Sequence, residues 1–253
     1  MPAFAFLLLA SNAAARVASL NLCTDEYLLL LARPEQVVSV SYLSQDSLES
    51  PLWRSARRFK GNRGSLEDIL PQRPTLVLTM GGGGRATAFL SKRLGIRVID
   101  LPFATDLNGV ADNLKTVASV LGQPALANGW IARLRDLEKS TPPSSTDAIW
   151  VSGGGQSLAA GSLGTQWLRL AGFQQRAIPG GRATLETLLT SPPKVLIKST
   201  YRSGQMSGGN HWLDHPIVRR AATTKQIGTD GRPWTCLGPL MIPEIERLRR
   251  IAR

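Results

Sequence analysis

The sequence predicts an α/β protein in which two similar lobes with mainly parallel sheets flank a helical connector. A short motif occurs twice: residues 65–70 (SLEDIL) and 184–189 (TLETLL) each precede a proline and an apolar strand, and the second copy follows the first by 119 residues. Two copies at a constant offset indicate two lobes of similar build. Strand and helix patterns alternate in both lobes, which favours parallel strands joined by helical crossovers.

Residues 1–15 are interpreted as a secretory signal. Residues 4–10 form a short apolar run, and Ala13 to Ala15 provide the small side chains that a signal peptidase requires. The run is much shorter than the roughly 20 apolar residues that span a bilayer. No Lys or Arg precedes it, so a buried strand is the alternative interpretation. We expect cleavage after Ala15 and export from the cytoplasm.

The first lobe is expected to cover residues 16–104. Thr24, followed by two acidic residues, is a typical start for the first helix. The strands are inferred from short apolar runs, and the later helices from capping residues and helical spacing. The expected strands cover 16–20, 37–41, 75–79 and 97–101, and the later helices cover 66–70 and 86–94.

The connector is expected to cover residues 105–143. Apolar residues from Leu107 to Leu121 recur at helical spacing, and a second helical stretch follows Gly122 and Pro124. The run 141–145 (TPPSS) ends the helical region. The second lobe, residues 144–253, then resumes the alternation. Its expected strands include 148–151, 195–197 and 225–227, and a helix from 243 onward closes the chain.

The chain carries a formal net charge of +12, which suggests anionic partners in general. The basic residues are scattered and show neither a nucleic-acid motif nor interleaved stacking aromatics. We therefore expect a solvated basic surface and no nucleic-acid partner. A basic nucleic-acid-binding module stays a rival interpretation that only the charge supports.

The only two cysteines are Cys23 and Cys236, near opposite ends of the chain. Two cysteines in an exported protein can form a disulfide. The alternative is two separate buried thiols, because sequence alone gives no geometry.

In parallel α/β sheets, ligands bind beyond the carboxyl ends of the strands, so the loops there are the candidate binding site. These loops are rich in glycine, which lets a bulky ligand approach the backbone, and they carry aromatic rings and arginines. The candidate ligand-binding residues are Cys23, Thr24, Tyr42, Met80, Gly82, Arg85, Gly155, Tyr201, Arg202, Trp234 and Cys236. Ordinary packing and ordinary surface positions are the alternative for any one of them.

Glu67 and Glu186 require a different interpretation, because each precedes a strand and so lies away from the crevice loops. One glutamate in the first turn of a short helix is commonly a surface residue that complements the helix dipole. Two glutamates at matching points of two lobes form a pair of acidic surface groups, which can meet arginines on a partner of matching symmetry.

Three other signals are weak. Gly81, Gly83 and Ala86, with Asp100 further on, approximate a dinucleotide fingerprint, but two strands precede this one, whereas the signature belongs on the first strand. His211 and His215 have the spacing of a metal pair without an evident third ligand, so we expect no metal site. A Gly-x-Ser-x-Gly elbow is absent from the sequence and only two histidines are present, so a nucleophile and base arrangement would be hard to build. A Rossmann-type dinucleotide-binding enzyme is the alternative.

Several segments together resemble the periplasmic binding proteins of iron-siderophore, haem and cobalamin uptake systems, the class with a helical backbone. The segments are 16–21 with 24–26, then 64–70 with Pro74 and 76–78, and then 94–98. The resemblance implies two α/β lobes joined by a long backbone helix, a ligand held between them, and docking onto an ABC transporter permease. In that family the two lobe glutamates pair with permease arginines, a role that falls here on Glu67 and Glu186.

The resemblance therefore implies a monomeric solute-binding protein that delivers a metal chelate to the permease. Such a protein makes or breaks no bond, so we expect neither an enzyme nor a cofactor. Cobalamin binders of this family use several rings in the first lobe, yet residues 79–84 (TMGGGG) carry none. The sequence does not choose among a ferric siderophore, haem and a corrinoid. A disulfide between Cys23 and Cys236 would tie the two lobes together.

Overall fold

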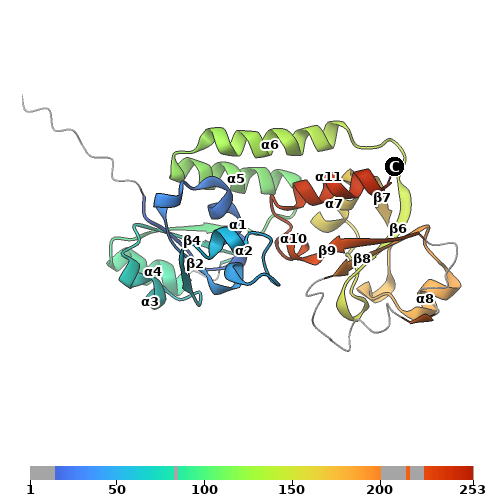
Figure 1. Ribbon diagram of the computed structural model, residues 1–253, viewed down its shortest axis with the longest axis horizontal. Coiled ribbons are helices and arrows are strands. Elements are labelled where there is room, and N and C mark those ends of the chain that lie inside the picture. The colour runs from blue at the N-terminus through green and yellow to red at the C-terminus, as the bar shows by residue number, and fades with distance from the viewer. Residues whose placement is uncertain (1–14, 83–84, 201–214, 217–224, 253) are drawn as a thin grey trace, which may run out of the picture.

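The computed structural model describes residues 15–82, 85–200, 215–216 and 225–252, and these form two α/β lobes side by side with two long helices running along one side of them (Figure 1). No helix in this described part is both long and apolar enough to cross a lipid bilayer. His211 lies outside these ranges, so the structure does not describe the pair that His211 could form with His215.

The first lobe contains a five-stranded sheet with the order β3-β2-β1-β4-β5, in which every pairing is parallel. Its strands are β1 (Val17–Ser19), β2 (Val37–Ser41), β3 (Lys60–Asn62), β4 (Leu76–Met80) and β5 (Arg97–Leu101). Its helices are α1 (Leu22–Leu31), α2 (Trp53–Ala56), α3 (Leu66–Ile69) and α4 (Arg85–Arg93), with short 3-10 turns at Pro34–Gln36, Tyr42–Gln45 and Leu70–Gln72.

The second lobe contains a four-stranded parallel sheet with the order β7-β6-β8-β9. Its strands are β6 (Thr146–Val151), β7 (Phe173–Gln175), β8 (Val195–Thr200) and β9 (Lys225–Asp230). Its helices include α7 (Leu163–Leu170), α8 (Leu185–Thr190), α10 (Gly231–Cys236) and α11 (Met241–Ala252), with 3-10 turns at Gly153–Gly155 and Pro179–Gly181.

The sheets confirm the internal repeat. Helix α3 leads into β4, which pairs with β1 on one side and with the edge strand β5 on the other. Helix α8 leads into β8, which lies in the same way between β6 and the edge strand β9. The two copies of the motif therefore occupy equivalent places in equivalent sheets. Strands β3 and β7 were not predicted, because three-residue edge strands give almost no periodic signal.

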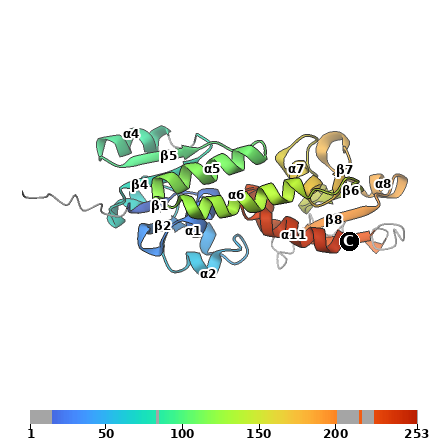
Figure 2. The ribbon, with the colours of Figure 1, turned by 90° about the horizontal axis from the view of Figure 1, so that it is seen from above.

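The connector consists of two helices, α5 (Leu107–Leu121) and α6 (Pro124–Lys139), rather than one long helix. Gly122 adopts a left-handed conformation (φ 67°) that ends α5, and Pro124 then opens α6. Figure 2 shows α6 lying across both lobes. Ala127 of α6 is buried in the core of the first lobe and Leu134 in that of the second, so one rigid element belongs to both cores.

Candidate functional site

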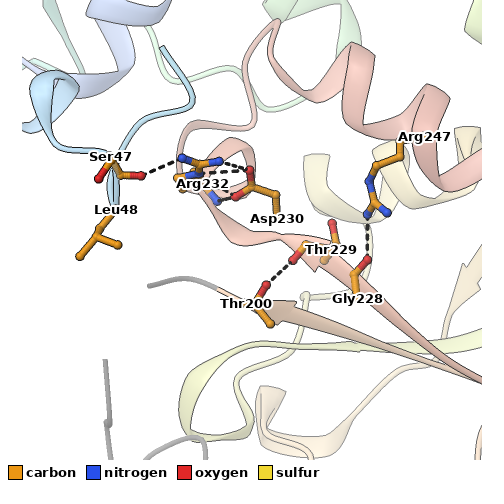
Figure 3. Close-up of a pocket in the computed structure, with 8 residues that line it drawn as sticks. All are labelled: Ser47, Leu48, Thr200, Gly228, Thr229, Asp230, Arg232 and Arg247. Carbon is orange, nitrogen blue, oxygen red and sulfur yellow. Dashed lines mark hydrogen bonds and ion pairs between the residues drawn. The ribbon is translucent and has the colours of Figure 1, made fainter. Parts of the chain in front are cut away.

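A pocket of ≈ 380 Å³ lies between the lobes, beyond the carboxyl ends of the second sheet (Figure 3). Open parallel sheets bind ligands at this edge, and the volume lies within the range of small-molecule sites. The first lobe contributes Ser47 and Leu48, and the second contributes Thr200, Gly228, Thr229, Asp230, Arg232 and Arg247. Both lobes therefore wall the pocket.

Arg232 spans the pocket from one lobe to the other. Its Nε donates to Asp230 Oδ1 at 2.9 Å and its Nη2 to Asp230 Oδ2 at 2.7 Å, while Nη1 donates to the carbonyl of Ser47 at 2.7 Å. Asp230 also caps α10 by accepting from the Arg232 amide at 3.0 Å. The hydrogen bond to Asp230 raises the pKa of Arg232, so the group is a fixed cation.

Arg247 supplies a second cation on the same wall. It donates to Glu244 and, through Nη2, to the carbonyl of Gly228 at 2.8 Å. The hydrogen bond to Glu244 raises the pKa of Arg247. The buried Thr229 hydroxyl donates to Glu244 in turn, so the carboxylate that orients this partly exposed arginine is itself held in place. The pocket thus offers two oriented guanidinium groups, each already paired with a carboxylate.

A second hollow, of ≈ 740 Å³, lies at the carboxyl ends of β2 and β3 in the first lobe. Its lining is polar and basic apart from one ring, and comprises Tyr42, Gln45, Lys60, Gly61, Asn62 and Arg63. The Tyr42 ring is 56% exposed. Within the described residues, neither Lys60 nor Arg63 takes part in an ion pair. An exposed ring beside two cations suits a flat ligand that carries acidic groups.

The floor of this hollow is held by hydrogen bonds. Asn62 Nδ2 donates to the Ser19 carbonyl at 2.9 Å and to Ser39 Oγ at 2.8 Å. Gln45 Nε2 donates to the Phe59 carbonyl at 2.8 Å. A Cβ atom at Gly61 would lie 2.6 Å from Gln45 Oε1, so glycine there is what allows Gln45 to lie against the strand. Sequence reasoning found Tyr42 but not its basic neighbours, because β3 was not predicted.

Cys23 and Cys236 form a disulfide, with Cα atoms 5.3 Å apart, that joins α1 of the first lobe to α10 of the second. Bonded sulfurs are not free to bind a ligand, so these residues hold the lobes together instead of lining the site. Neither cysteine belongs to the lining of the two pockets described above.

Thr24 and Trp234 are also in different roles from those expected. Thr24 is fully buried: its hydroxyl lies 2.7 Å from Ser19 Oγ, and its amide donates to Asn21 Oδ1 at 2.9 Å. It therefore secures the start of α1. Trp234 is only 7% exposed, packs against Trp150 at 5.2 Å between ring centroids, and donates to Thr229 Oγ1. It belongs to the core of the second lobe, because the first turn of α10 points its ring inward.

Among the described residues, Met80, Gly82 and Gly155 line neither pocket. Met80 is half-buried at the end of β4, and Gly155 is buried in the turn after β6. Gly82 is exposed, and its amide donates to Asp100 Oδ2 at 2.9 Å. Arg85 begins α4. Tyr201 and Arg202 lie outside the described residues.

The glycine loop after β4 does not support a dinucleotide site. Asp100, the acidic residue of the approximate fingerprint, accepts from Thr79 Oγ1 at 2.7 Å as well as from the Gly82 amide. The Asp100 carboxylate thus holds the glycine loop in place through hydrogen bonds, whereas the acidic residue of a dinucleotide fingerprint faces a ribose. The described residues also contain no group of three or more His, Cys, Asp or Glu side chains placed to hold a metal ion.

Sequence reasoning used Asp25 and Glu26 only as a signal for the start of the first helix, and did not predict that both acids are buried near the start of α1. Burial raises the pKa of Asp25 to about 7 and that of Glu26 to about 8. Asp25 accepts from the amide of Ser41 at 3.0 Å and from its hydroxyl, which fixes the loop that carries Tyr42. Glu26 accepts from the amide of Leu240, at the start of the last helix. One acid therefore positions the first-lobe loop and the other ties the lobes together.

Glu67 and Glu186 are both exposed, one on α3 and one on α8. Ser65 caps α3 by accepting from the Asp68 amide at 3.3 Å, and Thr184 caps α8 by accepting from the Thr187 amide at 3.1 Å. Each glutamate is thus the second residue of an equivalent short helix. Helices α3 and α8 lie toward the two outer ends of the molecule, on the side away from α5 and α6 (Figure 1).

No protein-family model matches the sequence, and no curated protein matches it. Solved structures do match. The periplasmic heme-binding protein HutB of Vibrio cholerae is 18% identical, with a TM-score of 0.72 over 95% of this chain and 99% of that one. The periplasmic heme-binding protein RhuT from Roseiflexus sp. RS-1 is 19% identical, with a TM-score of 0.71 over 94% and 97%. The periplasmic vitamin B12-binding protein BtuF of Vibrio cholerae is 19% identical, with a TM-score of 0.65 over 94% and 98%. This chain has the fold of those binding proteins.

Proposed function

We propose that this chain, which has the fold of periplasmic heme- and vitamin B12-binding proteins, is the solute-binding protein of an ABC importer for a metal chelate. The observation that carries the proposal is the pocket walled by both lobes, at the sheet edge where this architecture binds ligands. The protein is exported to the periplasm as residues 16–253. It consists of a first lobe (16–104), a connector (105–143) and a second lobe (144–253).

The ligand class is a bulky, flat chelate with acidic groups, such as haem, a corrinoid or a ferric siderophore. Tyr42 offers an exposed ring on the first lobe, and Lys60 and Arg63 offer cations beside it. Arg232 and Arg247 offer oriented guanidinium groups on the second lobe. Contacts from both sides suit a ligand too large for either lobe alone.

Capture requires no covalent step, so the chain acts as a binding protein and not as an enzyme, and without a cofactor of its own. It works as a monomer. Delivery relies on Glu67 and Glu186, which are exposed on equivalent helices and meet basic residues of the permease subunits in the inner membrane.

The test is a titration of the mature protein with three probes: hemin, cyanocobalamin and ferrichrome, followed by absorbance and by tryptophan fluorescence. We expect saturable 1:1 binding of one of them. Tyr42→Ala should weaken that binding, while Phe89→Ala, which removes a ring that is 65% exposed on α4, should not. Flat titrations for all three probes, or binding of NADH instead, would contradict the proposal.

A further inference from the structure

The repeated helices share a second exposed residue besides the glutamate. Leu70 is 37% exposed and Leu189 is 53% exposed, and Leu189 follows Leu70 by the same 119 residues that separate Glu186 from Glu67. Their immediate neighbours point inward, because Ile69 is 0% exposed and Leu188 is 4% exposed. In both lobes the same position of the motif therefore turns a large apolar side chain out to solvent.

The leucine and the glutamate of each lobe lie on one face of their helix. Leu70 follows Glu67 by three residues and has helical dihedrals (φ −55°, ψ −40°), and Leu189 follows Glu186 by three residues within α8. Residues three apart are neighbours on a helix surface. Each lobe thus presents a compact unit of one carboxylate and one isobutyl group.

Neither half of this unit has an evident structural role. Within the described residues, the carboxylates of Glu67 and Glu186 form no ion pair, although the chain carries 30 Lys and Arg residues against 18 Asp and Glu. A single exposed leucine requires no explanation. The same exposed leucine beside the same unpaired glutamate in both lobes is a duplicated surface feature, and a folding role would be met by any polar residue at these positions.

We infer that the two Glu–Leu units are a paired docking surface, in which Leu70 and Leu189 are apolar anchors beside the charged contacts of Glu67 and Glu186. This inference rests on the proposed function, and its occupant is the permease dimer of the importer. Two equal units require two equal sockets, which a two-fold symmetric partner supplies. Each socket needs a basic residue next to an apolar pocket, since the carboxylate gains from an opposite charge and the leucine side chain gains from removal from water.

The test measures binding of the unmodified protein and its variants to the permease–ATPase complex of the same organism, reconstituted in nanodiscs. We expect Leu70→Gln and Leu189→Gln each to weaken binding about tenfold, and the double variant to weaken it by more than either alone. Leu126→Gln is the matched control, because Leu126 is 46% exposed on α6, away from α3 and α8. Chemical unfolding curves and the affinity for the bound chelate should be the same for all these variants.

The outcomes separate the two claims. If the double leucine variant binds as tightly as the unmodified protein while Glu67→Arg with Glu186→Arg abolishes binding, the acidic groups act alone and this inference is wrong. If Leu126→Gln weakens binding as much as the other two, the effect is not specific to the units and the inference is also wrong. If the unmodified protein does not bind the complex at all, the proposed function fails and this inference fails with it.

Discussion

The Nη1 atom of Arg232 in the second lobe donates a hydrogen bond to the carbonyl oxygen of Ser47 in the first lobe at 2.7 Å. The same guanidinium also donates to the Ser50 carbonyl at 3.4 Å and forms an ion pair with Asp230. One side chain thus lines the pocket and joins its two walls. The proposed ligand contact and the spacing of the lobes therefore depend on the same group.

Replacing Arg232 should weaken the link between the lobes. Arg232→Met keeps most of the side-chain length but removes the hydrogen bonds to Ser47 and Asp230, and hydrogen bonds to charged groups are worth about 1.5–3 kcal/mol each. Since the group is partly exposed, we expect the free energy of unfolding in urea to fall by about 1–3 kcal/mol in total. An unfolding curve that superimposes on that of the unmodified protein would show that the bridge contributes nothing.

Breaking the disulfide should cost more. Cys23 and Cys236 close a loop of 213 residues, which strongly restricts the unfolded chain. The Cys23→Ser, Cys236→Ser double variant should lose roughly 3–5 kcal/mol of unfolding free energy. Thiol titration of the denatured, unreduced protein checks the premise: we expect no free thiol, and two free thiols would contradict it.

The buried carboxyl of Glu26 should make stability depend on pH. Its pKa is raised to about 8 in the folded protein from an ordinary value of 4.5, so the folded state keeps a proton that the unfolded chain releases. The stability that this proton supplies is complete below about pH 4.5 and is lost as the pH rises to about 8.

Glu26→Gln stays uncharged at every pH and can still accept from the Leu240 amide. The difference in unfolding free energy, variant minus unmodified protein, should therefore increase between about pH 4.5 and 8 and then level off. Urea titrations across this range measure the difference directly. A constant difference would mean that Glu26 is ionised in the folded protein throughout.

Two aromatic residues should respond differently to truncation, because one is in the core and one is on the surface. Trp234→Ala should cost about 3–5 kcal/mol of stability, as is usual for a large buried side chain. Tyr42→Ala should leave stability almost unchanged and weaken binding of the chelate by about 0.5–1.5 kcal/mol. Unfolding curves and ligand titrations on both variants distinguish these roles, and the reverse pattern would place Trp234 at the ligand.

Reversing the charge of the two glutamates proposed to dock onto the permease should separate capture from delivery. Glu67 and Glu186 line neither pocket, so Glu67→Arg with Glu186→Arg should leave the affinity for the chelate nearly intact. Uptake of the radiolabelled chelate by whole cells should be abolished, because the two introduced arginines would repel basic residues on the permease. Normal uptake by the double variant would refute docking through these residues.

The duplication, the parallel lobes and the helical connector were all predictable from the sequence, because each produces a local or repeating pattern. Apolar strands, capping residues and the motif at 65–70 and 184–189 are visible without any knowledge of contacts. The position of Glu67 and Glu186 away from the crevice also followed from their place before a strand. Chain order alone determines whether a residue lies at the amino end or at the carboxyl end of a parallel strand.

The tertiary structure alone decided which loop residues line the two pockets. Thr24 and Trp234 were expected in crevice loops, yet both lie in helices and point into the protein, because helical phase turns a side chain by about 100° per residue. The pocket between the lobes instead depends on Arg232 meeting Ser47, and the hollow of the first lobe depends on β3 bringing Lys60 beside Tyr42. These partners are far apart in the chain, and only packing brings them together. The sequence determined the two lobes, and their packing determined what the lobes present to a ligand.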